Sequence, residues 1–189
     1  APNDSRARFE ALGVKVIAGT ARFRDARTVV IGDQYEIAAR RFVIATGSSP
    51  ALPDIPGLAE TPHLTNETVF DLTQCPRHLI VIGGGPIGLE LAQAHRRLGA
   101  DVTVLEAAKP LAKDDPECAA IVLDRLAHEG VAIRAGVKIL RTERLRGKPR
   151  VILEVPEGGE EMIEGSHLLV ATGRRANVEG LGLEAAGIR

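Results

Sequence analysis

Short aliphatic runs alternate with glycine-containing turns along most of the chain. The clearest run, Leu79–Ile82, is continuous and leads into a glycine cluster, as is typical of a parallel strand covered on both faces. A helix is predicted from about Pro86 to Leu98, because proline suits a first helical turn and Gly99 is a natural C-terminal stop. The next strand is predicted at Asp101–Leu105.

The same alternation of strand and helix continues beyond this point. Asp115 as N-cap and Pro116 at the first helical position predict a second helix that ends before Gly130. The elements expected after it are a strand at Val131–Arg134, a meander between Val137 and Ile163, and a strand at Leu168–Ala171. This order predicts an α/β fold: a Rossmann-like parallel sheet with an inserted β-meander.

The beginning of the chain is rich in short β-branched segments. Strands are predicted there at Val14–Ile17, Thr28–Ile31, Tyr35–Ile37 and Arg41–Ala45. The stretch 48–63 holds four prolines, which predict an irregular connection that could link two domains.

Two parts of the sequence resemble each other in order. Gly13–Gly19 is similar to Gly130–Gly136, and each leads through a predicted meander to an apolar strand that ends in Ala-Thr-Gly, at Ala45–Gly47 and Ala171–Gly173. Two matches in the same order favour a duplicated unit. Only the second copy is preceded by a strand, a glycine loop and a helix.

The duplication predicts two domains. We interpret residues 1–75 as the C-terminal part of an incomplete Rossmann-like domain followed by a linker. Residues 76–189 are interpreted as a nucleotide-binding Rossmann domain.

The glycine pattern Gly83-x-Gly85-x-x-Gly88 predicts a dinucleotide site. The first glycine permits a tight turn, the second lets the backbone approach a pyrophosphate, and the third lets helix and strand pack closely. Glu106 follows the next strand, about 20 residues later, where a carboxylate binds the adenosine ribose. A carboxylate would repel the 2′-phosphate of NADP, and the nearest downstream cation is Lys109, so we expect NAD(H).

Composition excludes several other classes of function. The net charge is −1 and aromatic residues make up 3% of the 189 residues, which argues against nucleic-acid binding. No apolar run is long enough to span a bilayer, and we expect a soluble, cytoplasmic protein. Cys75 and Cys118 imply no disulfide framework, and the scattered histidines predict no metal site.

Four stretches together resemble the FAD-dependent pyridine nucleotide–disulfide oxidoreductases, a family that includes dihydrolipoamide dehydrogenase and mercuric reductase. They are Ala45–Pro50, Val81–Glu90, Thr103–Glu106 and Ala171–Asn177. The resemblance implies that the positions contacting NAD(H) are Gly83, Gly84, Gly85, Pro86, Ile87, Gly88, Leu89, Glu90, Glu106, Val137 and Gly173. It implies FAD contacts at Ala21, Thr46, Gly47 and Ser48.

The chain also departs from the family pattern. The glycine motif for the FAD pyrophosphate, the Cys-x4-Cys redox pair and the dimerisation domain with its catalytic His-Glu pair are missing, so no catalytic residue is assigned. We expect an internal portion of a homodimeric flavoenzyme that positions nicotinamide for hydride transfer with flavin. Alone it should neither hold FAD tightly nor reduce a disulfide. The alternatives are a non-catalytic NAD(H)-binding module and a flavin-dependent NADH oxidase or reductase without the cysteine pair.

Overall fold

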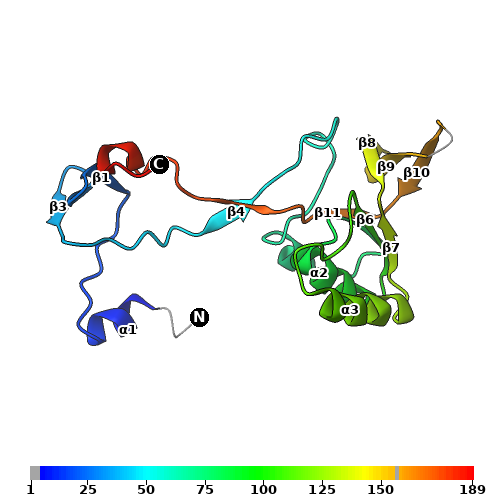
Figure 1. Cartoon of the computed structure of the whole chain (residues 1–189), viewed down its shortest axis with the longest axis horizontal. Helices are drawn as coiled ribbons and strands as arrows, with labels where there is room; N and C mark the ends of the chain where they lie inside the picture. Colours follow the sequence, from blue (N-terminus) through cyan, green and yellow to red (C-terminus); the bar gives the residue numbers. More distant parts are fainter. Residues whose placement is uncertain (1–4, 156–157) are drawn as a thin grey trace. The chain divides into compact units, whose positions relative to one another are not determined.

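The structure is a computed structural model that describes residues 5–155 and 158–189 (Figure 1). The chain forms two compact units. The smaller unit runs to Gly47 and includes Ala176–Arg189, and the larger unit is Ser48–Arg175. These bounds differ from the predicted domains, 1–75 and 76–189, because residues 48–75 pack within the larger unit and the last residues pack within the smaller one. The predicted boundary at residue 75 between the two copies of the duplicated unit stays a prediction.

A four-stranded parallel sheet forms the centre of the larger unit. Its strands, in spatial order, are β11 (His167–Val170), β5 (His78–Ile82), β6 (Asp101–Glu106) and β7 (Ala132–Ala135). Helix α2 (Pro86–Arg97) connects β5 to β6, and α3 (Pro116–His128) connects β6 to β7 (Figure 1). The predicted α/β fold with a parallel sheet is confirmed.

The predicted meander follows β7. Its antiparallel strands are β8 (Lys138–Leu145), β9 (Lys148–Glu154) and β10 (Glu160–Glu164), and β9 lies in the middle. A tight turn joins β8 to β9, and both of its residues, Arg146 and Gly147, have positive φ angles of 51° and 83°. The short strands β4 (Ser48–Pro50) and β12 (Arg174–Ala176) form a separate two-stranded sheet.

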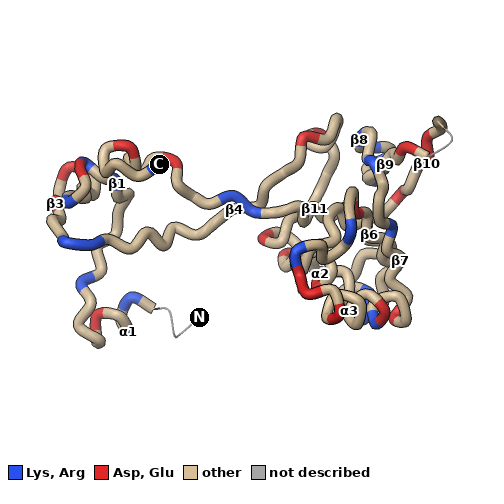
Figure 2. Tube along the Cα trace, viewed as in Figure 1, with Lys and Arg blue, Asp and Glu red and all other residues tan. Residues whose placement is uncertain are grey.

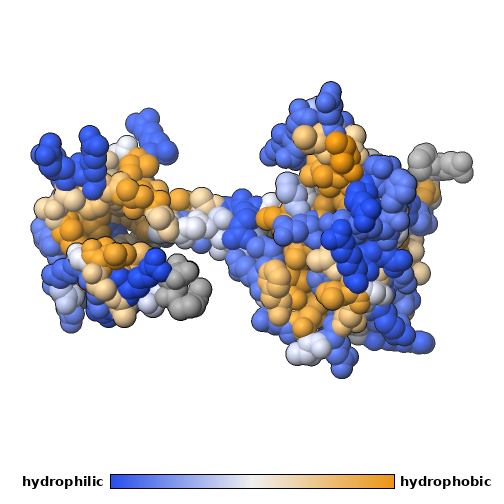
Figure 3. All heavy atoms as spheres, turned by 90° about the horizontal axis from the view of Figure 1, so that it is seen from below, coloured by the Kyte–Doolittle hydropathy of each residue, from blue (hydrophilic) through white to orange (hydrophobic). Residues whose placement is uncertain are grey.

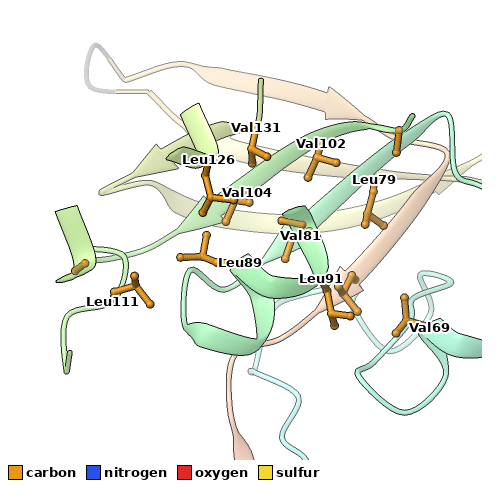
Figure 4. Packing of buried hydrophobic residues seen from close by; sticks show 14 residues of the cluster. Val69, Leu79, Val81, Leu89, Leu91, Val102, Val104, Leu111, Leu126 and Val131 are labelled. Carbon is orange, nitrogen blue, oxygen red and sulfur yellow. The ribbon is translucent and has the colours of Figure 1, made fainter. Parts of the chain in front are cut away.

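Both faces of the parallel sheet are covered, as the continuous apolar run of β5 predicted. Leu79 and Val81 point to the face packed by α2 and α3, where Leu126 is only 1% exposed (Figure 4). Ile80 and Ile82 pack on the other face against buried residues of the meander. The alternation places successive side chains on opposite faces, which is the period of a strand.

The helix ends are also as the sequence predicted. The Asp115 carboxylate accepts hydrogen bonds from the backbone N–H groups of Glu117 and Cys118, at 3.0 and 3.1 Å, and so caps α3. Beyond the end of α3, Glu129 lies between Arg97 of α2 and Arg125 of α3, which lower its pKa to about 2. This ion-pair cluster joins the C-terminal ends of the two helices that cover the sheet.

The smaller unit contains a second meander. The elements of this unit are α1 (Arg6–Ala11), the meander strands β1 (Ala21–Asp25), β2 (Thr28–Ile31) and β3 (Tyr35–Ala38), and the 3-10 helix η3 (Leu183–Ala186). The three strands are antiparallel in sequential order, as are β8, β9 and β10, so both copies of the predicted repeat contain a three-stranded meander. Few of its hydrophobic residues are buried, Phe23 and Ile31 among them, and hydrophobic atoms lie at its surface (Figure 3).

Two predicted strands of the smaller unit are wrong. Neither Val14–Ile17 nor Arg41–Ala45 pairs as a strand with any described residue, and Val43 is 91% exposed. A strand forms only where a neighbouring strand supplies its ladder of backbone hydrogen bonds, and no described strand pairs with either segment. Apolar, β-branched composition alone therefore overpredicts strands in this part of the chain.

Beyond the short strand β4, the proline-rich stretch is irregular as predicted, but it is not a free linker. Leu58 is 2% exposed and packs on the meander side of the core, and the Thr142 N–H donates to the Pro56 carbonyl at 2.8 Å. Leu64 then forms a parallel β-bridge with Leu169 of β11. The 3-10 helix η2 (Val69–Asp71) leads to β5. No helix in the described part of the chain is long and apolar enough to cross a membrane.

Candidate functional site

A cleft of about 830 Å³ opens at the carboxyl edge of the parallel sheet. Parallel strands place their carboxyl ends at one edge, where ligands of open α/β sheets bind. The cleft is lined by the segments that follow each strand: 83–87 after β5, 106–109 and 111–114 after β6, 136–139 after β7 and 171–173 after β11. Ile82 of β5, Leu105 of β6, and Pro53 and Ile55 also line it. All of these residues belong to the larger unit.

The three motif glycines are placed differently, and each placement has a separate physical reason. Gly83 has φ 113°, and a Cβ there would lie 2.5 Å from the Ala171 carbonyl oxygen, so a side chain would collide with the segment after β11. A Cβ on Gly88, inside α2, would overlap the Gly83 carbonyl oxygen. These two glycines are required by the fold itself.

Gly85 is not required by the fold. Its φ of −79° and ψ of 178° suit any residue, and a Cβ there would meet no described atom within 4 Å. Gly85 instead lines the cleft, at the N-cap of α2. A glycine that the fold does not need is explained by close approach of a ligand to the backbone.

The start of α2 suits an anion. No described side chain caps it, and its first turn carries no acidic residue. The first N–H groups of a helix have no partner within the helix, and the helix dipole places partial positive charge there. A phosphate group at this end would accept hydrogen bonds from backbone donors.

Glu106 is tied to the glycine loop. Its carboxylate accepts hydrogen bonds from the Gly84 N–H at 2.7 Å and from the Ala108 N–H at 2.9 Å. A Cβ on Gly84 would lie 3.0 Å from the Glu106 Cβ, so the absence of a side chain at Gly84 permits this contact. A carboxylate oxygen has two acceptor positions, and Glu106 therefore keeps acceptor capacity for ligand hydroxyl groups.

Two lysines, Lys109 and Lys113, belong to the connection between β6 and α3 and line the cleft with Glu106. Both are exposed, and Asp114 lies beside them in the lining. Basic and acidic segments alternate along this part of the larger unit (Figure 2). The lysines supply positive charge for an anionic ligand.

The remaining expected NAD(H) positions divide into cleft and non-cleft residues. Pro86, Ile87, Val137 and Gly173 line the cleft, whereas Leu89 is buried in the core. Glu90 is exposed and lines a second, smaller hollow of about 350 Å³ beside α3. A nicotinamide contact at Glu90 stays a prediction.

Three of the expected FAD positions, Ala21, Thr46 and Gly47, belong to the smaller unit, and the fourth, Ser48, belongs to the larger unit. Ala21 pairs with Ile31 in the first meander. In the smaller unit Thr46 donates a hydrogen bond to the Asn177 carbonyl at 2.6 Å, and Gly47 accepts one from the Asn177 N–H at 3.0 Å. In the larger unit the Ser48 hydroxyl accepts a bond from Arg174 at 2.7 Å. FAD contacts at these positions stay predictions.

Sequence reasoning missed several cleft residues. Pro53 and Ile55 reach it through the irregular stretch, and Leu111 and Lys113 through a loop without regular structure. Only the lysine carries a chemical signal in the sequence. Among the described residues no group of three or more His, Cys, Asp or Glu side chains could hold a metal ion.

Residues 3–189 match the family model described as "Pyridine nucleotide-disulphide oxidoreductase". The chain belongs to this family. The family is one of FAD- and pyridine-nucleotide-dependent oxidoreductases, in agreement with the cleft and its glycine turn.

Curated members of the family are similar over nearly the whole chain. A mercuric reductase of Lysinibacillus sphaericus is 41% identical over 174 residues, which cover 92% of this chain and 32% of that protein. A dihydrolipoyl dehydrogenase of Thermus scotoductus is 39% identical over 187 residues, covering 93% of this chain and 38% of that protein. The chain thus spans about a third of the length of the curated relatives it matches.

Solved structures of family members have the same fold. The HOCl-induced flavoprotein disulfide reductase RclA from Escherichia coli matches with a TM-score of 0.79 and 30% identity, over 93% of this chain and 40% of that one. LpdA from Mycobacterium tuberculosis matches with a TM-score of 0.80 and 30% identity, over 97% of this chain and 41% of that one.

Proposed function

We propose that the larger unit binds NAD(H) in the cleft at the carboxyl edge of its sheet. The observation that carries the proposal is the convergence of the glycine turn, the uncapped start of α2 and the Glu106 carboxylate on one cleft. The pyrophosphate would accept hydrogen bonds at Gly85 and the first turn of α2. The adenosine ribose would donate hydrogen bonds to Glu106.

The residues present fit a dinucleotide. Gly85 leaves space where a Cβ would stand, and the cleft volume of about 830 Å³ falls within the range of small-molecule and cofactor sites. Val137 and Ile139 supply an apolar wall close to Glu106, which suits a planar adenine ring. The cleft also extends to Gly173 after β11, so it is long enough to involve all four strand ends.

Within this proposal the nucleotide is NAD(H), not NADP(H). The Glu106 carboxylate is held in the cleft by two backbone hydrogen bonds and cannot readily turn away from a ligand. An added 2′-phosphate would bring like charge against it, whereas two ribose hydroxyls would donate to it. Lys109 and Lys113 partly offset this repulsion, but they are exposed and screened by solvent.

The role in a longer protein is also a proposal. There this unit would hold the nicotinamide end of NAD(H) in place for exchange with a flavin in a homodimeric enzyme. The chemistry that the bound nucleotide supplies is hydride transfer. The chain's own residues would bind the pyrophosphate and orient the ribose. The mercuric reductase and dihydrolipoyl dehydrogenase similarities support this role.

A fluorescence titration tests the nucleotide proposal. Purified chain is added to NADH and, separately, to NADPH, and nicotinamide fluorescence is followed to saturation. The expected result is saturable binding of NADH that is about ten-fold tighter than that of NADPH, the equivalent of one unfavourable charge contact of about 1.4 kcal/mol. Equal or tighter binding of NADPH would overturn the choice of cofactor, and binding of neither would overturn the proposed function.

A further inference from the structure

Leu111 combines three features that the nucleotide proposal leaves unexplained. It is a bulky, non-glycine residue with a positive φ of 52°, a conformation that is strained for such a side chain. Its side chain is 9% exposed and belongs to the core cluster between the sheet and the helices (Figure 4). Its backbone N–H donates a hydrogen bond to the Gly84 carbonyl oxygen at 3.0 Å.

The hydrogen bond fixes the orientation of one peptide plane in the glycine loop. A trans peptide is planar, so its C=O and the following N–H point in opposite directions. The structure describes no cis peptide bond. When Leu111 holds the Gly84 carbonyl, the Gly85 N–H is therefore on the opposite edge of the plane. No hydrogen-bond acceptor for that N–H is found among the described residues.

Gly84 is thus held on both sides. Its N–H donates to the Glu106 carboxylate at 2.7 Å, and its carbonyl accepts from Leu111. Without the second contact the plane between Gly84 and Gly85 could rotate, because two consecutive glycines restrict it little. Rotation would turn a carbonyl oxygen to where the N–H was, and an oxygen would repel a phosphate.

We infer that Leu111 is a positioning residue for pyrophosphate binding, which acts by orienting the peptide plane between Gly84 and Gly85. The inference rests on the proposed nucleotide function and adds a residue to it. The buried side chain keeps residue 111 in its left-handed conformation, and that conformation presents the N–H to Gly84. The strain is offset by burial of the side chain and serves the ligand contact.

An amide-to-ester substitution tests the inference, because it removes one N–H donor and keeps the side chain. Leucine is replaced by its α-hydroxy acid at position 111 in the full chain. The matched control is the same replacement at Ala100, by lactic acid. The Ala100 N–H donates to the His95 carbonyl, also at 3.0 Å, and Ala100 is buried at the amino edge of the sheet, away from the cleft.

Each protein is titrated with ADP and with adenosine, followed by NMR. ADP carries the pyrophosphate and adenosine does not. The expected result for the ester at 111 is a five- to ten-fold weaker affinity for ADP, the equivalent of about 1–1.4 kcal/mol, with adenosine affinity unchanged. The ester at position 100 should change neither the ADP affinity nor the adenosine affinity. If Leu111 served only general stability, the ester at 111 would lower the affinities for ADP and adenosine together.

The inference is wrong if the ester at 111 binds ADP as tightly as the unmodified chain, or loses ADP and adenosine affinity equally. If that ester does not fold, Leu111→Val provides the second test, since a branched Cβ resists positive φ and should withdraw the N–H. It too should lower ADP affinity more than adenosine affinity, and an equal loss contradicts the inference. Failure of the unmodified chain to bind NADH would instead overturn the proposed function.

Discussion

Replacement of Gly85 by alanine separates what the fold needs from what the ligand needs. An alanine Cβ would meet no described atom within 4 Å, and the backbone angles at Gly85 suit alanine. The free energy of unfolding should therefore stay equal or rise by about 0.4–1 kcal/mol, because alanine restricts the unfolded chain. The added methyl group lies where the backbone would approach the pyrophosphate. Loss of one charge-assisted hydrogen bond costs about 1.5–3 kcal/mol, or roughly 10- to 150-fold in affinity for NADH.

Two assays on the same protein are needed: urea unfolding for stability and fluorescence titration with NADH for affinity. Gly88→Ala is the contrasting variant, because its Cβ would overlap the Gly83 carbonyl oxygen and the fold itself should be destabilised. The reasoning would be refuted if Gly85→Ala bound NADH as tightly as the unmodified chain. It would also be refuted if Gly85→Ala were destabilised as strongly as Gly88→Ala.

Three further variants have defined outcomes. Glu106→Gln should weaken NADH about ten-fold and narrow the preference over NADPH, whereas the exposed control Glu117→Gln should leave both titrations unchanged. Lys113→Ala should weaken NADH by no more than about five-fold, an effect that should disappear in titrations at high salt. Glu129→Gln should lower the melting temperature at neutral pH. The pKa of Glu129 is depressed to about 2, so its stabilising contribution is present above the unfolded pKa and is lost on acidification. The melting temperatures of the variant and of the unmodified chain should therefore converge between about pH 4.5 and 2. A difference in melting temperature that stays the same over this pH range would contradict the stabilising role of the Glu129 ion pairs.

Local signals were sufficient for most of the larger unit. Strand β5 is a continuous apolar run, and Asp115 caps α3 through its own side chain, so both follow from a few neighbouring residues. The glycine turn and Glu106 could be predicted together because the interval between them corresponds to one helix and one strand. The structure adds the direct contact between Glu106 and Gly84, which spacing alone does not reveal.

Other features depend on contacts between distant parts of the chain. The run Arg41–Ala45 has the composition of a strand but lacks a described pairing partner, so its pattern misleads. Leu58 is buried by the meander, which begins some 80 residues later in sequence, and nothing in the proline-rich stretch announces this. The positive φ of Leu111 also has no signal in the sequence, because leucine predicts an ordinary backbone conformation.

The most direct test of the account is to locate NADH on the protein. Nitrogen–proton correlation NMR spectra of labelled chain are recorded during addition of NADH, and the amides that shift are assigned. Binding in the cleft predicts the largest shifts at Gly84, Gly85, Ile87 and Ala108, whose backbone groups belong to the cleft-lining glycine turn, the start of α2 and the Glu106 contact. Shifts confined to the hollow around Cys118, or to the smaller unit, would contradict the assignment of this cleft as the nucleotide site.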